Sequence, residues 1–208
     1  MKSFISLILL IIILSTVFSF NLWFEFESDI KSLRFEFKNL IFLPMFFLDK
    51  SIQTAFENKC DCFVINFING MNESDFFLLT IGLAGIQIFD DPYTSFSIIE
   101  SAAITTFVTY TLKILVGRAR PNYNSSPYIF KPFNFKNEFS SFPSGHSALA
   151  WATFTPIAEK YNKIFYLIPT VFSFSRVLGN YHWTSDVIFG AIIGHLIGKN
   201  FYKNKSVP

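Results

Sequence analysis

The most constraining feature of this 208-residue sequence is a series of apolar segments separated by short polar breaks. Runs of this kind are typical of helices that pack in or beside a membrane. The sequence therefore predicts an all-α fold, a bundle of several helices that includes the last two thirds of the chain. The predicted segments span residues 76–89, 98–116, 147–158, 164–178 and 187–198.

Composition narrows the class of protein. Hydrophobic residues make up 51% of the chain and charged residues 15%, whereas an ordinary soluble domain carries about 25% charged residues. This balance excludes a disordered protein, and two cysteines are too few for a disulfide scaffold. A formal net charge of +2 argues against a nucleic-acid partner.

The N-terminal segment, residues 1–20, has its own signature. Lys2 precedes an apolar run over residues 4–20, which fits either a cleaved signal peptide or a retained membrane anchor. Residues 21–75 match no pattern with a known role, and we expect them to form part of the same domain as the helical bundle of residues 76–208.

Segment length leaves two settings open for this bundle. Several segments are shorter than the ~17–25 residues that cross a bilayer, although flanking residues can extend them. We expect a membrane-embedded bundle, with a soluble or peripheral bundle outside the inner membrane as the alternative.

Three motifs combine basic residues and histidines at the ends of apolar segments. They read KILVGRARP over residues 113–121, FPSGHS over 142–147 and SRVLGNYHWTSD over 175–186. A cation at the edge of an apolar segment is costly unless it meets an anion, and few acidic residues lie nearby in the sequence. Arg forks and a Lys point charge suit phosphate oxygens. The motifs therefore predict a phosphate-like ligand bound by Lys113, Arg120 and Arg176.

The second and third motifs add groups that can bind and react. Ser144 and Gly145 stand where an apolar segment begins, and backbone N–H groups at a helix start attract anions. His182 and Asp186 are four residues apart, which places them on one face if the segment is helical. A carboxylate on one ring nitrogen leaves the other free to attack, and His146 can then act as acid and base.

Topology supports a shared location for the motifs. If the last four segments each cross a bilayer, all three motifs lie on the same side. Lysines mark the other side, which is cytoplasmic by the positive-inside rule, so the motifs face outward. A soluble up-and-down bundle would also gather them at one end. The marking lysines are Lys160, Lys163, Lys199, Lys203 and Lys205.

Taken together, the three complete motifs resemble the type 2 phosphatidic acid phosphatase superfamily, over roughly residues 75–200. That superfamily includes lipid phosphatases, bacterial non-specific acid phosphatases and vanadium haloperoxidases. The phosphate-binding residues that the resemblance implies are Lys113, Arg120, Ser144, Gly145 and Arg176. It further implies that His182 is the nucleophile, giving a phosphohistidine. His146 would protonate the leaving oxygen and then activate water, and Asp186 would orient His182.

The resemblance implies a metal-independent phosphatase with no cofactor, acting on a lipid phosphomonoester or diphosphate. Candidate substrates are phosphatidic acid, phosphatidylglycerophosphate, undecaprenyl diphosphate and lipid A. The expected location is the inner (cell) membrane, with the active site facing the periplasm or exterior. The alternatives are a soluble periplasmic acid phosphatase of broad specificity, a vanadate-dependent haloperoxidase and a non-enzymatic membrane protein. The sequence makes no prediction of oligomeric state.

Overall fold

The computed structural model describes residues 27–28, 30–31, 44–56 and 62–205. The chain divides into two compact units, residues 1–34 and 35–208, and the helices α2 to α8 belong to the second unit. The predicted signal peptide or anchor, residues 1–20, lies outside the described residues.

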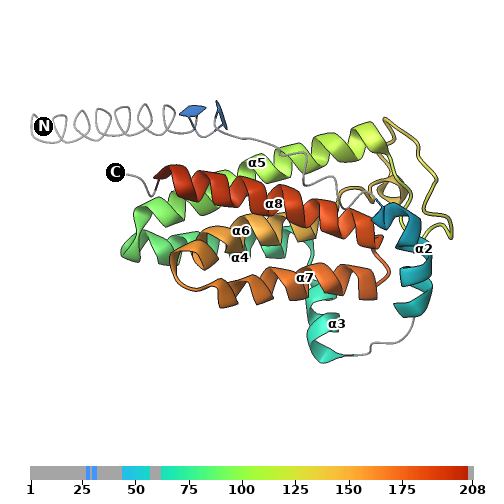
Figure 1. Cartoon of the computed structure of the whole chain (residues 1–208), viewed down its shortest axis with the longest axis horizontal. Coiled ribbons are helices and arrows are strands. Elements are labelled where there is room, and N and C mark those ends of the chain that lie inside the picture. Colours follow the sequence, from blue (N-terminus) through green and yellow to red (C-terminus); the bar gives the residue numbers. More distant parts are fainter. Residues whose placement is uncertain (1–26, 29, 32–43, 57–61, 206–208) are drawn as a thin grey trace, which may run out of the picture. The chain divides into compact units, whose positions relative to one another are not determined.

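The second unit is a bundle of α-helices (Figure 1). Within the described part of the chain, the β-structure is limited to one isolated bridge between Arg118 and Phe130. The prediction of an all-α bundle is therefore confirmed. The helices are α2 (Met45–Phe56), α3 (Phe63–Gly70), α4 (Glu73–Asp90), α5 (Pro92–Val116), α6 (Gly145–Lys160), α7 (Leu167–Leu178) and α8 (Thr184–Lys205), with short 3₁₀ helices at Asn137–Phe139 and Lys163–Tyr166.

Each predicted apolar segment corresponds to a helix, but most helices are longer than the segments. Helix α5 begins six residues before the predicted position 98, because Asp91 caps it and Pro92 occupies its first turn. The Asp91 carboxylate accepts hydrogen bonds from the Tyr93 N–H at 3.1 Å and the Thr94 hydroxyl at 2.7 Å. Apolar periodicity marks the stretch that is sheltered from water, whereas capping side chains set where the helix starts.

The centre of the bundle is the packing of α8 against α5 and α6, and these helices lie side by side (Figure 1). Glycines make this close approach possible. A Cβ on Gly190 would collide with the Ser144 carbonyl oxygen, and one on Gly194 would collide with the Ala148 carbonyl oxygen. The small residues of the last segment therefore bring α8 into backbone contact with the start of α6.

Helix α5 ends at Gly117, whose φ of 59° suits glycine. The chain then forms a long loop that leads to the start of α6 and is interrupted by the 3₁₀ turn Asn137–Phe139. At this same end of the bundle, α2 contacts α7 and α8, and α3 contacts α7. Residues from the segment of unknown role thus lie against α7 and α8 at the motif end of the bundle (Figure 1).

Among the described residues, α5 is the one helix that is long and apolar enough to cross a membrane.

Candidate active site

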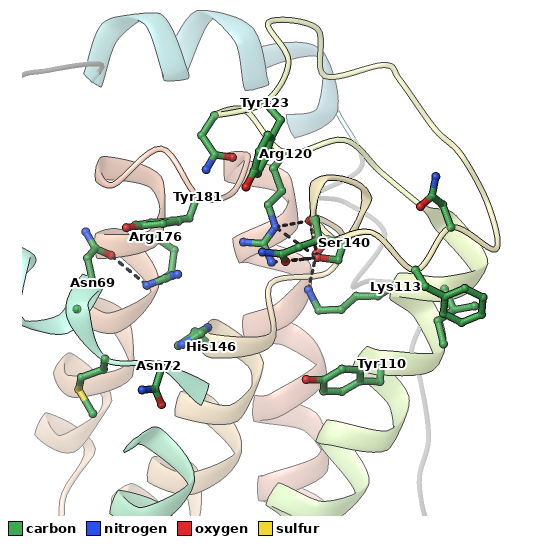
Figure 2. A pocket seen from close by; sticks show the side chains of 17 residues that line it. Asn69, Asn72, Tyr110, Lys113, Arg120, Tyr123, Ser140, His146, Arg176 and Tyr181 are labelled. Atoms are coloured by element: carbon green, nitrogen blue, oxygen red, sulfur yellow. Dashed lines mark hydrogen bonds between the residues drawn. The ribbon is translucent and has the colours of Figure 1, made fainter. Parts of the chain in front are cut away.

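The three motifs meet at one end of the bundle, as expected. Helix α5 ends there, α6 starts there, and α7 returns to it before α8 begins (Figure 1). A cavity of about 640 Å³ opens between them, and Lys113, Arg120, His146 and Arg176 all line it. Figure 2 shows these four side chains around the cavity, although they come from three separate parts of the chain.

Neutral oxygens hold the three cationic side chains in place. Lys113 Nζ donates to the Ser140 carbonyl at 2.5 Å, and Arg120 Nη2 donates to the Ser140 hydroxyl at 3.0 Å. Arg176 Nη1 donates to Asn69 Oδ1 at 3.2 Å, and its guanidinium lies 4.3 Å from the centre of the Tyr181 ring. Each of these contacts is to an uncharged group and helps to position the cationic side chain.

The start of α6 presents polar atoms that have no protein partner. The Ser144 hydroxyl oxygen and His146 Nε2 are buried and form no hydrogen bond in the described structure. Buried polar atoms normally pair, so two orphans at a helix N-terminus beside a cationic cavity indicate a ligand site. Lys113 also packs near Gly145, because a Cβ on that glycine would lie 3.6 Å from Lys113 Cε.

His182 is 1% exposed and is not among the side chains that line the cavity. Its Nδ1 lies 2.7 Å from the Ser141 carbonyl oxygen. Because a carbonyl can only accept, Nδ1 carries the proton, and Nε2 keeps the lone pair needed for attack. Burial lowers the pKa of His182 well below its usual value, and the positive charges of Arg120 and Lys113 lower that pKa further. The imidazole is therefore neutral at neutral pH.

Asp186 and His182 are not placed on one helical face, as their four-residue spacing suggested. His182 precedes α8, so only Asp186 of the pair is helical. Asp186 Oδ2 lies 3.9 Å from His182 Nδ1, beyond hydrogen-bonding distance. This carboxylate oxygen instead accepts from the Ser141 hydroxyl at 2.5 Å and from the Trp183 N–H at 3.0 Å. Asp186 reaches His182 through Ser141, and its role in orienting the imidazole stays a prediction.

Sequence reasoning missed several residues of the site. Asn69, near the end of α3, and Asn72, which caps α4, form part of the cavity wall, and no sequence signal marks them. Arg118 lies inside the first motif but does not line the cavity, and it forms ion pairs with Asp49 and Asp186. The sequence shows Arg118 two residues before Arg120, but no sequence signal indicates that Asp49 is its partner.

A second, smaller cavity adjoins the first. It has a volume of about 290 Å³ between α4, α5 and the start of α6, and Phe76, Phe77 and Leu149 give it an apolar wall. His146 and Tyr110 line both cavities. His146 thus stands where a polar, cationic chamber meets an apolar one.

The remaining histidine lies elsewhere. His195 Nδ1 is 3.3 Å from the Thr155 hydroxyl, and its ring packs against Trp151 and Tyr166. Within the described ranges, no group of three or more His, Cys, Asp or Glu side chains is arranged to hold a metal ion.

The structure is thus a helical bundle in which the three motifs meet at one cationic, histidine-containing cavity. A family model described as the PAP2 superfamily matches residues 94–206. The chain therefore belongs to the PAP2 superfamily, and the resemblance inferred from the motifs is confirmed.

Individual relatives are similar over parts of the chain. The lipid A 1-phosphatase of Rhizobium johnstonii is 33% identical over 107 residues, which are 49% of this chain and 42% of that protein. The lipid A 1-phosphatase of Porphyromonas gingivalis is 36% identical over 70 residues, which are 30% of this chain and 16% of that protein. The chain thus spans less than half the length of these curated relatives.

Two solved structures share the fold. Aquifex aeolicus LpxE matches with a TM-score of 0.60 and 19% identity, over 75% of this chain and 95% of that one. A transmembrane PAP2-type phosphatidylglycerolphosphate phosphatase from Bacillus subtilis matches with a TM-score of 0.57 and 19% identity, over 88% of this chain and 92% of that one.

Proposed function

We propose that this chain is a metal-independent phosphatase that hydrolyses the phosphate ester or diphosphate of a membrane lipid through a phosphohistidine. One observation carries the proposal. Three cationic side chains and His146 converge on a single cavity. The positive charges of the same three cations act on the buried imidazole of His182, whose Nδ1 lies against the Ser141 carbonyl.

The first half of the proposed reaction forms the phosphoenzyme. Lys113, Arg120 and Arg176 bind the phosphoryl oxygens, and these positioned cations stabilise the charge of the transition state. His182 Nε2 attacks phosphorus, an N–P bond forms, and the P–O bond to the lipid breaks. His146 donates a proton to the departing oxygen. The negative charge of the bound phosphate favours the protonated form of His146 in that complex.

The second half regenerates the enzyme. His146, now neutral, takes a proton from water, and the resulting oxygen nucleophile attacks phosphorus. The N–P bond breaks, inorganic phosphate is released, and His182 returns to its neutral form. The Ser144 hydroxyl and the N-terminus of α6 supply further donors to the phosphoryl oxygens in both steps.

The apolar cavity supports a lipid substrate. The leaving group departs beside His146, and the apolar cavity begins at that residue. An acyl chain or another apolar portion of the leaving group fits this chamber better than a hydrated headgroup does. The similarity to two lipid A 1-phosphatases favours a phosphorylated glycolipid among the candidate substrates.

We further propose that the bundle lies in the cell membrane with the motif end facing outward. Large apolar side chains project from the outer faces of α4, α5 and α7, as lipid contact requires. Lys160 ends α6 and Lys163 begins the 3₁₀ helix that follows, at the opposite end of the bundle, which the positive-inside rule assigns to the cytoplasm. Examples of exposed apolar side chains are Phe77, Leu78, Ile81, Phe107 and Phe174.

The test is phosphate release by detergent-purified protein, with EDTA present, from lipid A, phosphatidic acid, phosphatidylglycerophosphate, undecaprenyl diphosphate and p-nitrophenyl phosphate. The proposal expects at least one lipid to be preferred over the soluble ester, and a His182→Ala variant to release no phosphate. Release from none of these substrates would overturn it, as would activity that requires added divalent metal or survives in His182→Ala.

One observation favours a second candidate, a soluble periplasmic acid phosphatase of broad specificity. Only α5, among the described helices, has the length and composition of a membrane span. Extraction separates the two candidates. Release by osmotic shock without detergent, together with a preference for soluble esters, would favour the soluble enzyme.

A further inference from the structure

A buried cluster of three charged side chains joins α2, the first motif and the first turn of α8. Arg118 Nη1 donates to Asp186 Oδ1 at 2.6 Å, and Arg118 Nη2 donates to Asp49 Oδ2 at 2.7 Å. All three side chains are fully buried. A guanidinium between two carboxylates in a dry interior needs both partners, because each unpaired N–H would lose its hydrogen bond to water without replacement.

Asp49 comes from α2, outside residues 94–206 that the family model matches. Its carboxylate uses both oxygens. Oδ1 accepts from the Ser185 N–H at 2.8 Å, and Oδ2 accepts from the Ser185 hydroxyl at 2.6 Å as well as from Arg118. Asp49 therefore holds Arg118 and the first turn of α8 at the same time.

The contacts continue from this cluster to the imidazole of His182. Asp186, held by Arg118 through Oδ1, uses Oδ2 to accept from the Ser141 hydroxyl. The Ser141 carbonyl then accepts the proton on His182 Nδ1 at 2.7 Å. Hydrogen bonds thus lead from Asp49 through Arg118 and Asp186 to the Ser141 hydroxyl, and a further hydrogen bond joins the carbonyl of the same serine to His182.

We propose that Asp49 is a positioning residue for the nucleophile. Through Arg118 and Asp186 it fixes Ser141, and Ser141 fixes the tautomer and orientation of His182. The inference rests on the proposed function, in which His182 Nε2 attacks phosphorus. It gives α2, in the segment to which the sequence assigns no role, a direct part in preparing the site.

Asp49→Asn is the sharpest perturbation. An asparagine of the same shape has one acceptor oxygen and one amide donor, whereas Ser185 and Arg118 both present donors to this side chain. One of those donors must lose its acceptor, so the series of contacts loosens at its origin. The three cations that bind phosphate are not part of the series.

The experiment measures kcat and KM on the preferred lipid, and the inhibition constant of inorganic phosphate. Asp49→Asn should lower kcat about 100-fold, the order of loss that a misplacement of about 1 Å produces. KM and the phosphate inhibition constant should stay within about threefold of wild type, because the phosphate-binding side chains keep their own partners. A kcat within about threefold of wild type would overturn the inference, as would a loss confined to KM.

Gln53 provides a matched control on the same helix. It is buried one turn after Asp49 and donates to Asn180 Oδ1 and to the Val177 carbonyl, so it also anchors α2. Gln53→Leu should lower Tm without lowering kcat. If both variants lose kcat in proportion to Tm, α2 is only a structural support and the inference is wrong.

Two further measurements keep the test decisive. If Asp49→Asn does not accumulate as folded protein, Asp49→Glu keeps the charge but displaces the carboxylate. The same split between kcat and KM is then expected, with a kcat loss of about tenfold. Nitrogen-15 NMR of the histidines should show a proton on His182 Nδ1 in wild type and a mixture of tautomers in the variant.

The NMR measurement does not depend on turnover. A wild type with no activity on any phosphate, but with the tautomer change on substitution, would refute the proposed function and leave the positioning role intact. An unchanged tautomer in folded Asp49→Asn or Asp49→Glu would refute the positioning role.

Discussion

Gly190→Ala tests whether the α6–α8 contact aligns the two halves of the active site. Gly190 lies in α8, and a Cβ there would fall closer than 3.0 Å to the Ser144 carbonyl oxygen. Ordinary van der Waals contact begins at 3.4 Å. The two helix backbones would therefore separate locally by something on the order of 1 Å, because a close-packed interior has no room to absorb a methyl group.

Separating the two helices would displace the active-site residues of α6 relative to those of α8. Ser144 and His146 belong to the α6 side of the site, whereas Asp186 belongs to α8, and the Ser144 N–H donates to the Asp186 carbonyl at 2.9 Å. A misplacement of about 1 Å between reacting groups costs about 100-fold in rate. At 1.36 kcal/mol for each factor of ten, the loss in transition-state stabilisation is about 2.7 kcal/mol. Overpacking should also lower the free energy of unfolding by about 1–3 kcal/mol.

The assay is kcat for phosphate release from the preferred lipid, with Tm measured on the same preparation. Gly82→Ala is the matched control, because a Cβ on that α4 glycine meets nothing within 4 Å. It should leave kcat unchanged and raise the free energy of unfolding by about 0.5–1 kcal/mol, since alanine is the better helix former. A Gly190→Ala enzyme with wild-type kcat would refute the reasoning, as would an equal loss in Gly82→Ala.

Three other predictions follow from the site. Arg120→Gln should raise the pKa of His182, because the positive charge of Arg120 lowers that pKa in wild type. In wild type the imidazole should stay neutral through pH 6.5, where an unperturbed histidine titrates. Histidine NMR measures both, and a wild-type midpoint at or above 6.5 contradicts the argument. Ser144→Ala should lower kcat/KM by about 10- to 100-fold without lowering Tm, because the buried hydroxyl has no protein partner to lose, and a lower Tm would show that the hydroxyl serves the fold. EDTA should leave phosphate release unchanged, and inactivation reversed by added divalent metal would refute metal independence.

The apolar segments were sufficient to predict the bundle because burial and lipid contact require long runs of apolar side chains. Their ends were less predictable. Helix α5 starts at a cap formed by Asp91, and a carboxylate at a helix start looks in sequence like any other polar residue. The prediction that the motifs meet at one end was confirmed, because alternating helix directions place alternate helix ends together.

The chemical identities of the site residues were also readable from sequence. Lys113, Arg120 and Arg176 are costly at the ends of apolar segments, so their occurrence in three motifs indicated a common anion before any fold was known. His146 was added to this set because it stands at the predicted start of an apolar segment. The structure brings all four side chains to one cavity, as the motifs predicted.

Tertiary structure decided how the imidazole of His182 is held. Local spacing suggested a direct contact from Asp186, but His182 lies in the turn before α8, and the contact passes through Ser141. The ion pair between Asp49 and Arg118 joins residues 69 positions apart. The sequence by itself determined which groups are candidates for binding and attacking a phosphoryl centre, because that choice depends on residue type. Only the folded chain decided which buried charges orient them, because such pairing depends on distances across the bundle that no local pattern encodes.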